Sequence, residues 1–267
     1  MMMTDDIDEA IDWQGRAVVC DPCAHRALVA SGRCRLKHAC VHDRYARRID
    51  RFFNWNPSLA NGYLEHPHFE VRAIAAKHAD IFRLPPLLRD PEETVRWNAA
   101  RRLPKRMILS LRDDPHREVR IRIANLLDEV ELAPMASDPD YYVRLVVARR
   151  LPPALLGPLM TDEDAEVRRV VARRIPDEWV VRMMDDKAAP VRVEIAQRAQ
   201  LALLTRLKAD PDWRVRYEVA ARIPREDLLS LTEDSDQLVA ELARSRLHPV
   251  DAQDRRIPLG QQERVRP

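Results

Sequence analysis

The sequence of 267 residues has little glycine and few aromatic residues. Glycine occurs five times and aromatic residues make up 5% of the chain, while leucine, alanine, arginine and glutamate are frequent, a composition that favours helix. The sequence contains no glycine-rich phosphate-binding loop, no nucleophile motif and no His-Glu-x-x-His motif, and serine and threonine are scarce. These absences predict a protein that is not an enzyme.

Long apolar runs are also missing. No stretch approaches the ~18 consecutive apolar residues of a membrane span. The start, MMMTDDIDEAIDW, is acidic and lacks the basic segment and apolar core of a secretory signal. We therefore expect a cytoplasmic protein that does not contact a membrane and whose thiols stay reduced. The net charge of +2 is small for a chain with 33% charged residues, so bulk attraction to nucleic acid is not implied.

The chain does contain a strict internal repeat. The dipeptide Val-Arg recurs every 24 residues seven times, and the eighth slot holds Val239-Ala240. The seven copies begin at Val71, Val95, Val119, Val143, Val167, Val191 and Val215. A fixed period over about two thirds of the chain predicts a solenoid. A solenoid offers a long continuous surface rather than a central pocket.

Each unit is expected to hold one α-helix and one short 3₁₀ segment. In the copy spanning 138–161, Val143, Val147 and Leu151 form one apolar stripe, and Pro152 ends the helix after about ten residues. The leucine-rich second half spans only about seven residues, which is too short for another α-helix and two turns. The fold class that follows is all-α, a solenoid of 24-residue repeats preceded by a small four-cysteine module.

Small residues recur where neighbouring helices are expected to meet. One slot is alanine in six successive copies: Ala100, Ala124, Ala148, Ala172, Ala196 and Ala220. A small side chain there would let adjacent helices approach closely and share one core. Two copies carry Asp128 and Gln200 where others have proline, so their helices are expected to end differently or to run longer.

Charged residues follow the same period. The arginine after each valine is matched by aspartates at 90, 114, 138, 162, 186, 210 and 234, five residues before each Val. Two matched series of opposite sign favour an intramolecular ladder over a row of arginines for phosphates. A second arginine series lies at 102, 150, 174, 198, 222 and 246. Solvated arginines at the negative end of the helix dipole explain it best, and it is also the first place to look for an anionic ligand.

Within each repeat, two aspartates are candidates to cap the helix. In the copy spanning 138–161 these are Asp138 and Asp140, and either side chain suits the N-cap position.

All four cysteines lie in the first 40 residues, and the repeats contain none. They are Cys20, Cys23, Cys34 and Cys40. A Cys-x-x-Cys pair followed by two more cysteines predicts a metal or cluster site rather than disulfides in a reducing compartment. The wide second pair is unusual for zinc, and the spacing also differs from the bacterial ferredoxin run, so spacing alone leaves zinc and an iron–sulfur cluster open. Three histidines are possible substitute ligands: His25, His38 and His42.

The cysteine segment is strongly basic. Residues 24–51 carry eight Lys or Arg against two Asp. This excess of six could offset the negative charge of four thiolates, or form a docking patch for an acidic partner or nucleic acid. The segment 52–55, Phe-Phe-Asn-Trp, is the most aromatic in the chain. We expect it to dock the cysteine module onto the first repeat.

Together, the four cysteines and the 24-residue repeats resemble the leucine-rich repeat variant proteins, a small bacterial family with the same two parts in the same order. The resemblance spans nearly the whole chain. It implies that the repeats alternate an α-helix with a 3₁₀-helix and wind into a right-handed superhelix without β-strands. It also implies a 4Fe–4S cluster with Cys20, Cys23, Cys34 and Cys40 as ligands, with zinc as the alternative. The family is associated with nitrogen-fixing bacteria. The copy at Val239 departs from the repeat, as a terminal cap would.

These observations predict four regions: an acidic tail over 1–15, a four-cysteine iron–sulfur module over 16–60, about eight repeats over 61–249, and a disordered tail over 250–267. The expected function is a non-enzymatic, monomeric scaffold for a macromolecular partner, most simply a protein, with a cluster that is structural or responds to redox state or iron. One alternative is an electron-transfer or redox-sensing protein whose solenoid selects the partner. A second is a nucleic-acid-binding protein.

Overall fold

The regular secondary structure of the part that the structure describes, residues 9–248 of a computed structural model, consists of α-helices and 3₁₀-helices. Within this range there are two isolated β-bridges, Ile11–Ala17 and Arg35–Ala39, and no strand. The predicted all-α fold is therefore confirmed, while the predicted C-terminal tail, 250–267, lies outside the described residues. None of the helices in residues 9–248 has the length and apolar character needed to cross a bilayer. The chain divides into two compact units, Met1–Arg150 and Leu151–Pro267.

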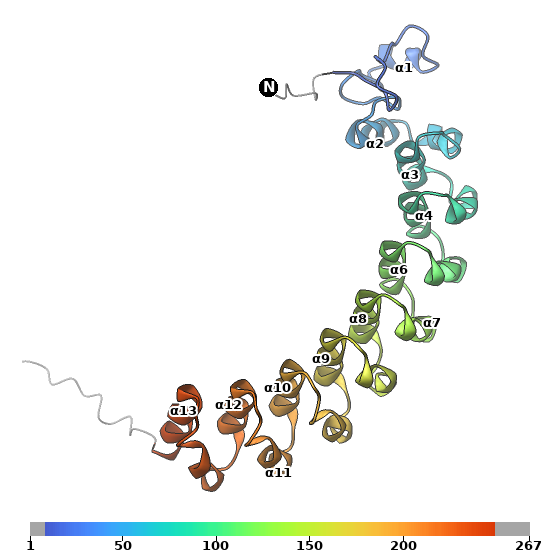
Figure 1. The fold of residues 1–267 in the computed structure, drawn as a ribbon. Helices are drawn as coiled ribbons and strands as arrows, with labels where there is room; N and C mark the ends of the chain where they lie inside the picture. Colours follow the sequence, from blue (N-terminus) through green and yellow to red (C-terminus); the bar gives the residue numbers. More distant parts are fainter. Residues whose placement is uncertain (1–8, 249–267) are drawn as a thin grey trace, which may run out of the picture. The chain divides into compact units, whose positions relative to one another are not determined.

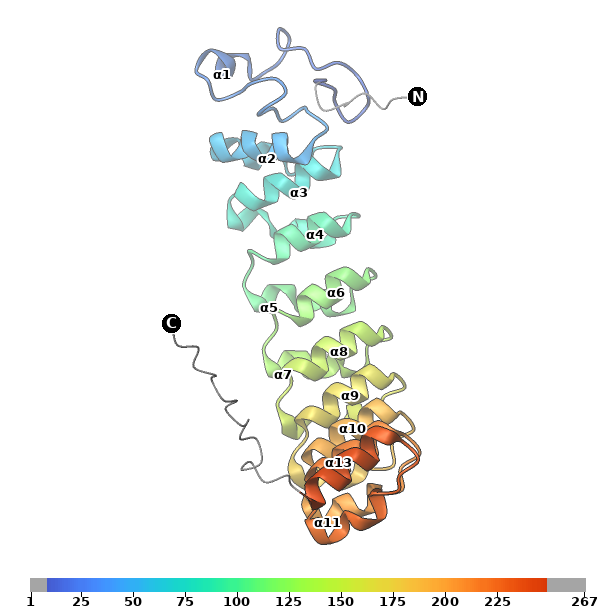
Figure 2. The same ribbon diagram turned by 90° about the vertical axis from the view of Figure 1, so that its left-hand side faces the viewer.

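The first unit holds the cysteine module, the first three repeats and the long helix of the fourth (Figures 1 and 2). Its α-helices are α1 (Arg26–Ala30), α2 (Ala46–Trp55), α3 (Phe69–His78), α4 (Glu93–Ala100), α5 (Lys105–Ile108), α6 (Arg117–Ala124), α7 (Glu129–Leu132) and α8 (Tyr141–Arg150). Its 3₁₀ segments are η2 (Pro57–Tyr63), η3 (Ile81–Arg83), η4 (Pro85–Arg89), η5 (Leu109–Asp113) and η6 (Ala133–Ser137). Helices α2, α3, α4, α6 and α8 pack in that order, and the shorter segments lie along the other side.

The second unit repeats the same arrangement. Its α-helices are α9 (Ala165–Arg174), α10 (Ala189–Arg198), α11 (Leu201–Leu204), α12 (Trp213–Arg222) and α13 (Gln237–Leu247). Its 3₁₀ segments are η7 (Pro153–Leu155), η8 (Gly157–Thr161), η9 (Asp177–Met183), η10 (Thr205–Leu207), η11 (Arg225–Asp227) and η12 (Leu229–Leu231). Helices α9, α10, α12 and α13 pack in that order.

Local sequence explains where each long helix begins and ends. The Asp164 carboxylate caps α9 by accepting hydrogen bonds from the backbone amides of Glu166 and Val167, at 2.8 and 3.4 Å. Of the two candidate caps for α8, the structure uses Asp140, whose carboxylate accepts from the Tyr142 amide at 2.9 Å. Ten-residue helices such as α9 then end just before a proline, as predicted.

The copies without this proline do not have longer helices. Helix α10, in the copy with Gln200, keeps ten residues, and α6, in the copy with Asp128, has only eight. Their second halves begin with one α-turn, α7 or α11, instead of a 3₁₀ turn. Because Pro104 precedes the same kind of turn, α5, the proline does not decide the form of the second half.

The alanine slot lies at the centre of the core. All six alanines of the slot have no exposed surface: Ala100, Ala124, Ala148, Ala172, Ala196 and Ala220. The repeat valines on the same helices are buried beside them, and Leu156, Leu204 and Leu228 from the short segments close the core from the other side. Within each unit, neighbouring repeats therefore share an apolar layer, which no single repeat could build.

Replacing Ala196 with leucine is expected to destabilise the protein by about 1–3 kcal/mol, because α10 packs between α9 and α12 and has no room for three more carbon atoms. Ala221→Leu is the matched control, since Ala221 is exposed on α12 and its change should stay within about 0.5 kcal/mol. Urea unfolding followed by circular dichroism measures both. Equal midpoints for the two variants would show that the slot is not tightly packed.

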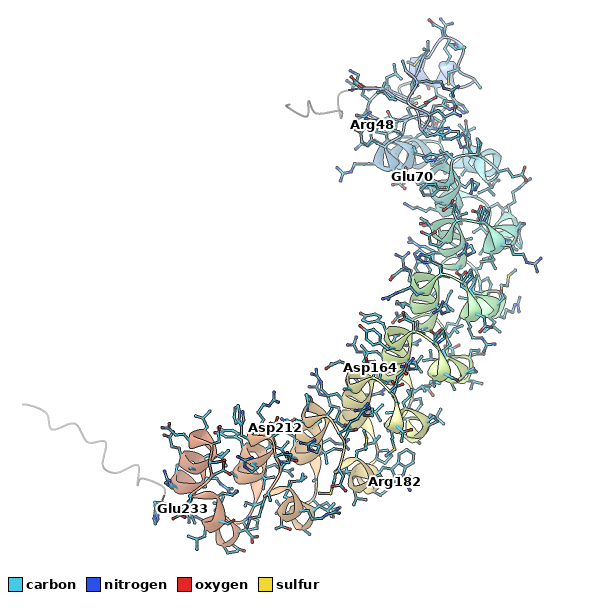
Figure 3. The ribbon with its side chains drawn as sticks, in the orientation of Figure 1. Arg48, Glu70, Asp164, Arg182, Asp212 and Glu233 are labelled. Atoms are coloured by element: carbon cyan, nitrogen blue, oxygen red, sulfur yellow. The ribbon has the colours of Figure 1, made fainter. Side chains whose placement is uncertain are left out.

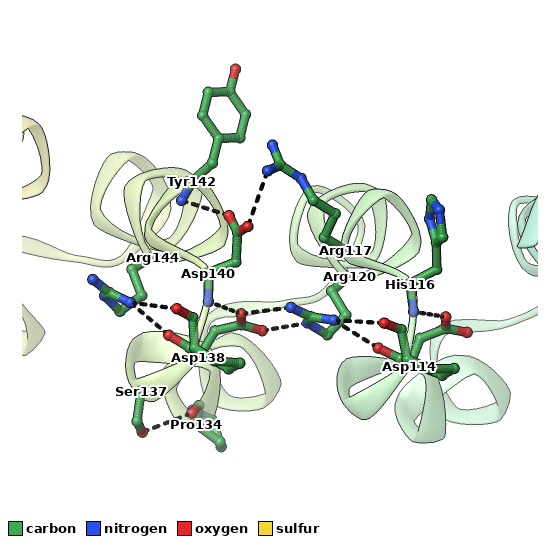
Figure 4. Close-up of polar contacts among 12 residues, drawn as sticks. Asp114, His116, Arg117, Arg120, Pro134, Ser137, Asp138, Asp140, Tyr142 and Arg144 are labelled. Atoms are coloured by element: carbon green, nitrogen blue, oxygen red, sulfur yellow. Dashed lines mark hydrogen bonds and ion pairs between the residues drawn. The ribbon is translucent and has the colours of Figure 1, made fainter. Parts of the chain in front are cut away.

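The Val-Arg arginines form the expected intramolecular ladder with the repeated aspartates (Figure 4). In each described pair the guanidinium reaches the aspartate 18 residues later, at the start of the next repeat, with Nε–Oδ2 distances of 2.7–2.8 Å. The pairs are Arg72–Asp90, Arg96–Asp114, Arg120–Asp138, Arg168–Asp186, Arg192–Asp210 and Arg216–Asp234. The same guanidiniums also donate to the backbone carbonyl six residues earlier. Within each unit, the ladder therefore joins neighbouring repeats.

The electrostatics of the ladder follow from this geometry. Burial alone would raise the pKa of Asp186, yet hydrogen bonds from Arg168 and from the Ala188 amide hold it below its usual value. The bond to Asp186 in turn raises the pKa of Arg168. Both groups stay charged, and their hydrogen-bonding atoms are used inside the protein.

The second arginine series is neither solvated nor free for an anion, which corrects the sequence-based interpretation. These half-buried side chains donate to carbonyls at the end of the preceding long helix. The bonds run from Arg102 to Ala76 and Ala79, from Arg150 to Ala124, from Arg198 to Ala172 and Ile175, from Arg222 to Ala196 and Ala199, and from Arg246 to Ala220 and Ile223. Helix C-termini leave carbonyls without partners, and the next repeat supplies them. Leu126 occupies the equivalent position between Arg102 and Arg150, and its side chain cannot donate such a bond.

Candidate metal centre

The cysteine module is built from turns rather than regular elements. Cys20 and Cys23 share a turn closed by a 3.1 Å bond from the Cys23 amide to the Cys20 carbonyl. The loop between Cys34 and Cys40 is closed by the Arg35–Ala39 bridge, and its tip residue, Lys37, has a φ of 61°. A positive φ is uncommon outside glycine and marks a tight turn. This turn is what allows two cysteines six positions apart to return to the same place.

Residues 10–15, assigned from the sequence to the acidic tail, are part of this structure. The amide of Arg44 donates to the Ile11 carbonyl at 2.9 Å, and the buried Arg48, which is labelled in Figure 3, donates to the Glu9 carbonyl at 2.9 Å. Trp13 stacks on His68, just before α3, with ring centroids 5.4 Å apart. The N-terminal strip therefore connects the cysteine module to the first repeat.

The structure brings the four predicted cysteines together as free thiols. Cys34 and Cys40 are buried and hydrogen-bonded to each other, while Cys20 and Cys23 are half-buried. Burial raises the pKa of Cys20, and charge on Cys40 and Cys23 raises it further. The bond to Cys34 together with burial raises the pKa of Cys40, while the same bond lowers the pKa of Cys34. Such a group disfavours several thiolates at once unless a cation neutralises them, so these donors suit a metal or cluster.

The four thiols are not arranged around one point. Among residues 9–248, no group of three or more His, Cys, Asp or Glu side chains is positioned to hold a single metal ion. Thiolates on one zinc each lie about 2.3 Å from it, whereas a four-iron cluster separates its ligands by the width of the cluster. The ligand roles of Cys20, Cys23, Cys34 and Cys40 remain a prediction.

His25 and Tyr63 lie beside the thiols and contact each other, which nothing in the sequence predicts. His25 Nε2 forms a short hydrogen bond with the Tyr63 hydroxyl, and the His25 amide donates to Cys23 Sγ at 3.4 Å. Burial raises the pKa of Tyr63 to about 12, and charge on Cys23, Cys40 and Cys34 acts in the same direction. The Tyr63 hydroxyl thus lies within electrostatic reach of three of the four thiols.

The histidines proposed as substitute ligands make other contacts. His25 bonds Tyr63, and His38 Nδ1 contacts Arg51 Nη1 at 2.9 Å. Burial lowers the pKa of both His25 and His42, so both are neutral at pH 7. The rings of His25 and His42 are stacked, with centroids 6.3 Å apart.

The aromatic segment docks the module onto the first repeat, as predicted. Phe52 and Phe53 are fully buried on α2. Phe52 lies 5.2 Å from the His25 ring, and Phe53 lies 5.4 Å from Tyr63 and 6.1 Å from His78 on α3 (centroid distances). These contacts link the surroundings of the thiols directly to the solenoid.

Some of the positively charged side chains in the module are paired or hydrogen-bonded within it. Arg48, which is buried, pairs with the buried Asp43 at 2.9 Å, and Arg51 donates to the His38 carbonyl at 2.9 Å. The cations that remain at the surface include Arg26, Arg33, Arg35, Lys37 and Arg47.

An open cavity of about 570 Å³ lies beside the thiols. Cys23 lines it together with Trp13, Val19, His42 and His66. Val19 is 57% exposed at its rim. The Cys23 side of the thiol group is therefore accessible from solvent.

The solenoid of α/3₁₀ repeats and the four-thiol module define an iron–sulfur repeat protein, and comparison with known proteins supports this. Residues 10–62 match the family model described as LRV protein FeS4 cluster. A solved structure titled "A leucine-rich repeat variant with a novel repetitive protein structural motif" is 41% identical, with a TM-score of 0.81, and the match covers 86% of this chain and 99% of that one. The chain belongs to the leucine-rich repeat variant family.

A curated relative from Rhodobacter capsulatus is also similar. It is described as an uncharacterized 27.7 kDa protein in the nifB 3' region, and it is 50% identical over 96 residues. The match covers 36% of this chain and 39% of the relative, so the chain spans about two fifths of that protein's length.

Proposed function

We propose that the protein is a non-enzymatic, monomeric, cytoplasmic scaffold that binds a protein partner along its repeats and carries a 4Fe–4S cluster on Cys20, Cys23, Cys34 and Cys40. The observation that carries the cluster proposal is the near absence of an apolar core around four adjacent thiols. Between residues 9 and 45, the buried residues are Cys34, Ala39, Cys40, Val41 and Asp43. A segment this short and this poor in core needs a metal or cluster to hold it. The location of a relative in a nif region supports a setting in nitrogen fixation.

The surrounding residues have separable roles in this proposal. A bound cluster supplies one-electron chemistry and positive charge against the thiolates. The Arg48–Asp43 pair fixes the loop that carries Cys40, since Asp43 also accepts from the Tyr45 amide at 3.0 Å and the Cys40 amide donates to the Arg48 carbonyl at 3.2 Å. The His25 amide donates to Cys23 Sγ, a kind of bond that stabilises a thiolate.

Protein purified without oxygen is expected to be brown and to hold about four iron and about four sulfide per chain. Cys40→Ser should lose most of both, because Cys40 is buried and the chain's three other cysteines are already ligands in this proposal, so no spare thiol can replace it. His42→Ala is the matched control and should keep the full content, which separates thiolate from imidazole ligation. Elemental analysis and visible absorption measure the outcome, and a colourless protein with one zinc per chain would refute the cluster.

The scaffold part of the proposal rests on the exposed side chains of the long helices. Tyr141, Tyr142, Trp213 and Tyr217 are 37–44% exposed on α8 and α12, although large aromatic side chains are usually buried. A photo-crosslinking amino acid at Tyr142 or Trp213 should capture partners in cells, and one at Leu229, exposed on the 3₁₀ side, should not. Capture that does not distinguish the two sides would contradict a binding role for the long helices.

Electron transfer is the second candidate, and the cavity beside Cys23 favours it, because electron exchange needs a short path from cluster to partner. The test is a reversible reduction of the holoprotein together with a transfer rate that depends on a partner protein. A cluster that cannot be reduced without being destroyed would exclude electron transfer and leave only a structural role for the cluster.

A further inference from the structure

One side of the first unit presents arginines that the fold does not use. On α4, α6 and α8 the last turns carry Arg101, Arg122 and Arg149, with Asn125 between them. Helix α4 packs against α6, and α6 against α8, so the three arginines follow one another across the packed helices. We call Arg101, Arg122 and Arg149 the arginine band.

No ion pair neutralises the arginine band among residues 9–248. Within residues 9–248, the guanidiniums of Arg101 and Arg149 have neither a hydrogen-bond partner nor an ion-pair partner, and both side chains are exposed. Arg122 lies over the Trp97 ring at 5.2 Å, a contact that orients the guanidinium and leaves its charge in place. No Asp or Glu occurs in the last turn of α4, α6 or α8.

The same slot is neutral elsewhere in the repeats. Lys77 on α3 pairs with Asp50 at 3.1 Å, and Arg173 on α9 pairs with Glu194 at 2.5 Å. The corresponding residues on α10, α12 and α13 are Gln197, Ala221 and Ser245. Unneutralised charge in this slot is therefore confined to α4 and α8, with Arg122 beside it on α6.

A purely structural role does not account for the arginine band. Arginine near a helix C-terminus is favoured by the helix dipole. However, the capping bonds at the ends of α3 and α6 come from Arg102 and Arg150, whereas Arg101 and Arg149 donate to no carbonyl among the described residues. The arginine band therefore makes no capping bond, and its side chains are exposed.

Two exposed aromatic residues lie at the other end of α8, the helix that carries Arg149. Tyr141 and Tyr142 are 44% and 37% exposed in the first turn of α8. Figure 4 shows Tyr142 projecting away from the Arg–Asp ladder and from the 3₁₀ segments, beside Arg117 of α6. Arg117 pairs with Asp140 at 3.2 Å and with Glu118 at 3.5 Å, so this end of the surface is neutral and partly apolar.

The spacing of the band indicates the form of its ligand. Packed helices lie about 8–10 Å apart, so Arg101 and Arg149, two helices apart, are separated by about 16–20 Å. An extended peptide in the polyproline II conformation advances about 3.1 Å per residue with three residues per turn, so carboxylates at every third residue share one face and recur about every 9 Å, which matches the spacing of the helices. Nucleic acid fits less well, because duplex-binding proteins typically neutralise about 6–10 phosphates and the band has three cations.

We propose that the arginine band binds an extended acidic segment of a partner protein, with acidic side chains at every third residue and flanking apolar groups on Tyr141 and Tyr142. This rests on the scaffold function proposed above and names the chemistry of its partner. The segment crosses α4, α6 and α8, with its carboxylates on Arg101, Arg122 and Arg149.

The test uses the full-length holoprotein and a fluorescein-labelled peptide, (Glu-Ser-Thr) repeated four times, with binding followed by anisotropy at low salt. The double variant Arg101→Glu/Arg149→Glu should weaken binding by about tenfold or more. Arg83→Glu/Arg106→Glu is the matched control, with the same change of charge at exposed sites on η3 and α5, and should stay within about twofold of the parent. The peptide with Lys in place of Glu should not bind.

Three results would overturn the proposal. The first is absence of binding to the acidic peptide, the second is equal weakening by both double variants, and the third is tighter, band-dependent binding of a twelve-residue oligothymidine. These outcomes are distinct from failure of the scaffold proposal. If partners were captured only through Trp213, the scaffold function would stand and the acidic ligand of the arginine band would be refuted. If the peptide bound but no partner were captured in cells, the acidic ligand would stand and the scaffold function would be refuted.

Discussion

Asp114→Ala is expected to destabilise the protein by about 3–5 kcal/mol, because it leaves the Arg96 guanidinium buried without its counter-charge. Arg96 and Asp114 form a two-bond pair, with both N–O distances at 2.7 Å, and the two side chains are 9% and 1% exposed. The remaining acceptors of Arg96 are the Asp90 and Pro91 carbonyls, at 2.8 and 3.0 Å, which carry no full charge. Urea unfolding, followed by circular dichroism, measures the loss.

Two further variants separate the buried charge from the pair itself. The double variant Arg96→Met/Asp114→Leu removes both charges and should recover most of the lost stability, since replacing a buried pair with apolar groups is often neutral. Asp185→Ala breaks an exposed pair with Arg206, 3.6 Å apart, and should cost less than about 1 kcal/mol. If Asp114→Ala cost no more than Asp185→Ala, the ladder would not contribute to stability.

Oxidative loss of the cluster is expected to abolish hydrogen-exchange protection from about residue 16 to 45 while the central repeats stay protected. The module contributes few buried apolar side chains of its own, and α1 contributes none. Helix α2 should keep part of its protection, because Ile49, Phe52 and Phe53 are buried and α2 packs on α3. Repeats respond mainly to their nearest neighbours, so the effect should fade beyond α3.

Exchange measured on holo and apo protein distinguishes three situations. Loss confined to the module supports a cluster that holds the N-terminal end together. Loss spread evenly through Val215 would mean that the cluster supports the whole array. Unchanged exchange around Cys20 would mean that the cluster has no structural role, which would favour the electron-transfer function.

The sequence predicts the solenoid well because its information is periodic. Val143 and Ala148 recur at fixed spacing, and a strict 24-residue period has room for one α-helix and one shorter segment. The two matched charge series predicted the ladder, but they did not predict which aspartate each arginine contacts. Arg96 contacts the aspartate of the next repeat rather than its own because stacking, which no single repeat reveals, brings Asp114 beside it.

Contacts whose partners lie outside a single repeat were less predictable. Arg102 and its equivalents were expected in solvent, since nothing in one repeat shows that the previous helix offers its carbonyls to them. Tyr63 is one of five tyrosines, and its position near Cys23, Cys34 and Cys40 depends on how η2 folds back on the module. The four cysteines, by contrast, stood out because the rest of the chain has none.

The bonds between repeats join residues that are close in the sequence, and this affects how the protein folds during its synthesis. The ladder joins residues 18 positions apart, and the second arginine series joins residues 23 or 26 apart. Such low contact order favours fast folding. A repeat has its main partners as soon as the next one has left the ribosome, so the array can fold progressively during synthesis. The bonds of the cysteine module span 38 and 39 residues, yet they need only the chain up to Tyr63, whereas the first ladder pair, Arg72–Asp90, needs the chain up to residue 90. The module therefore has its partners before the first repeat does.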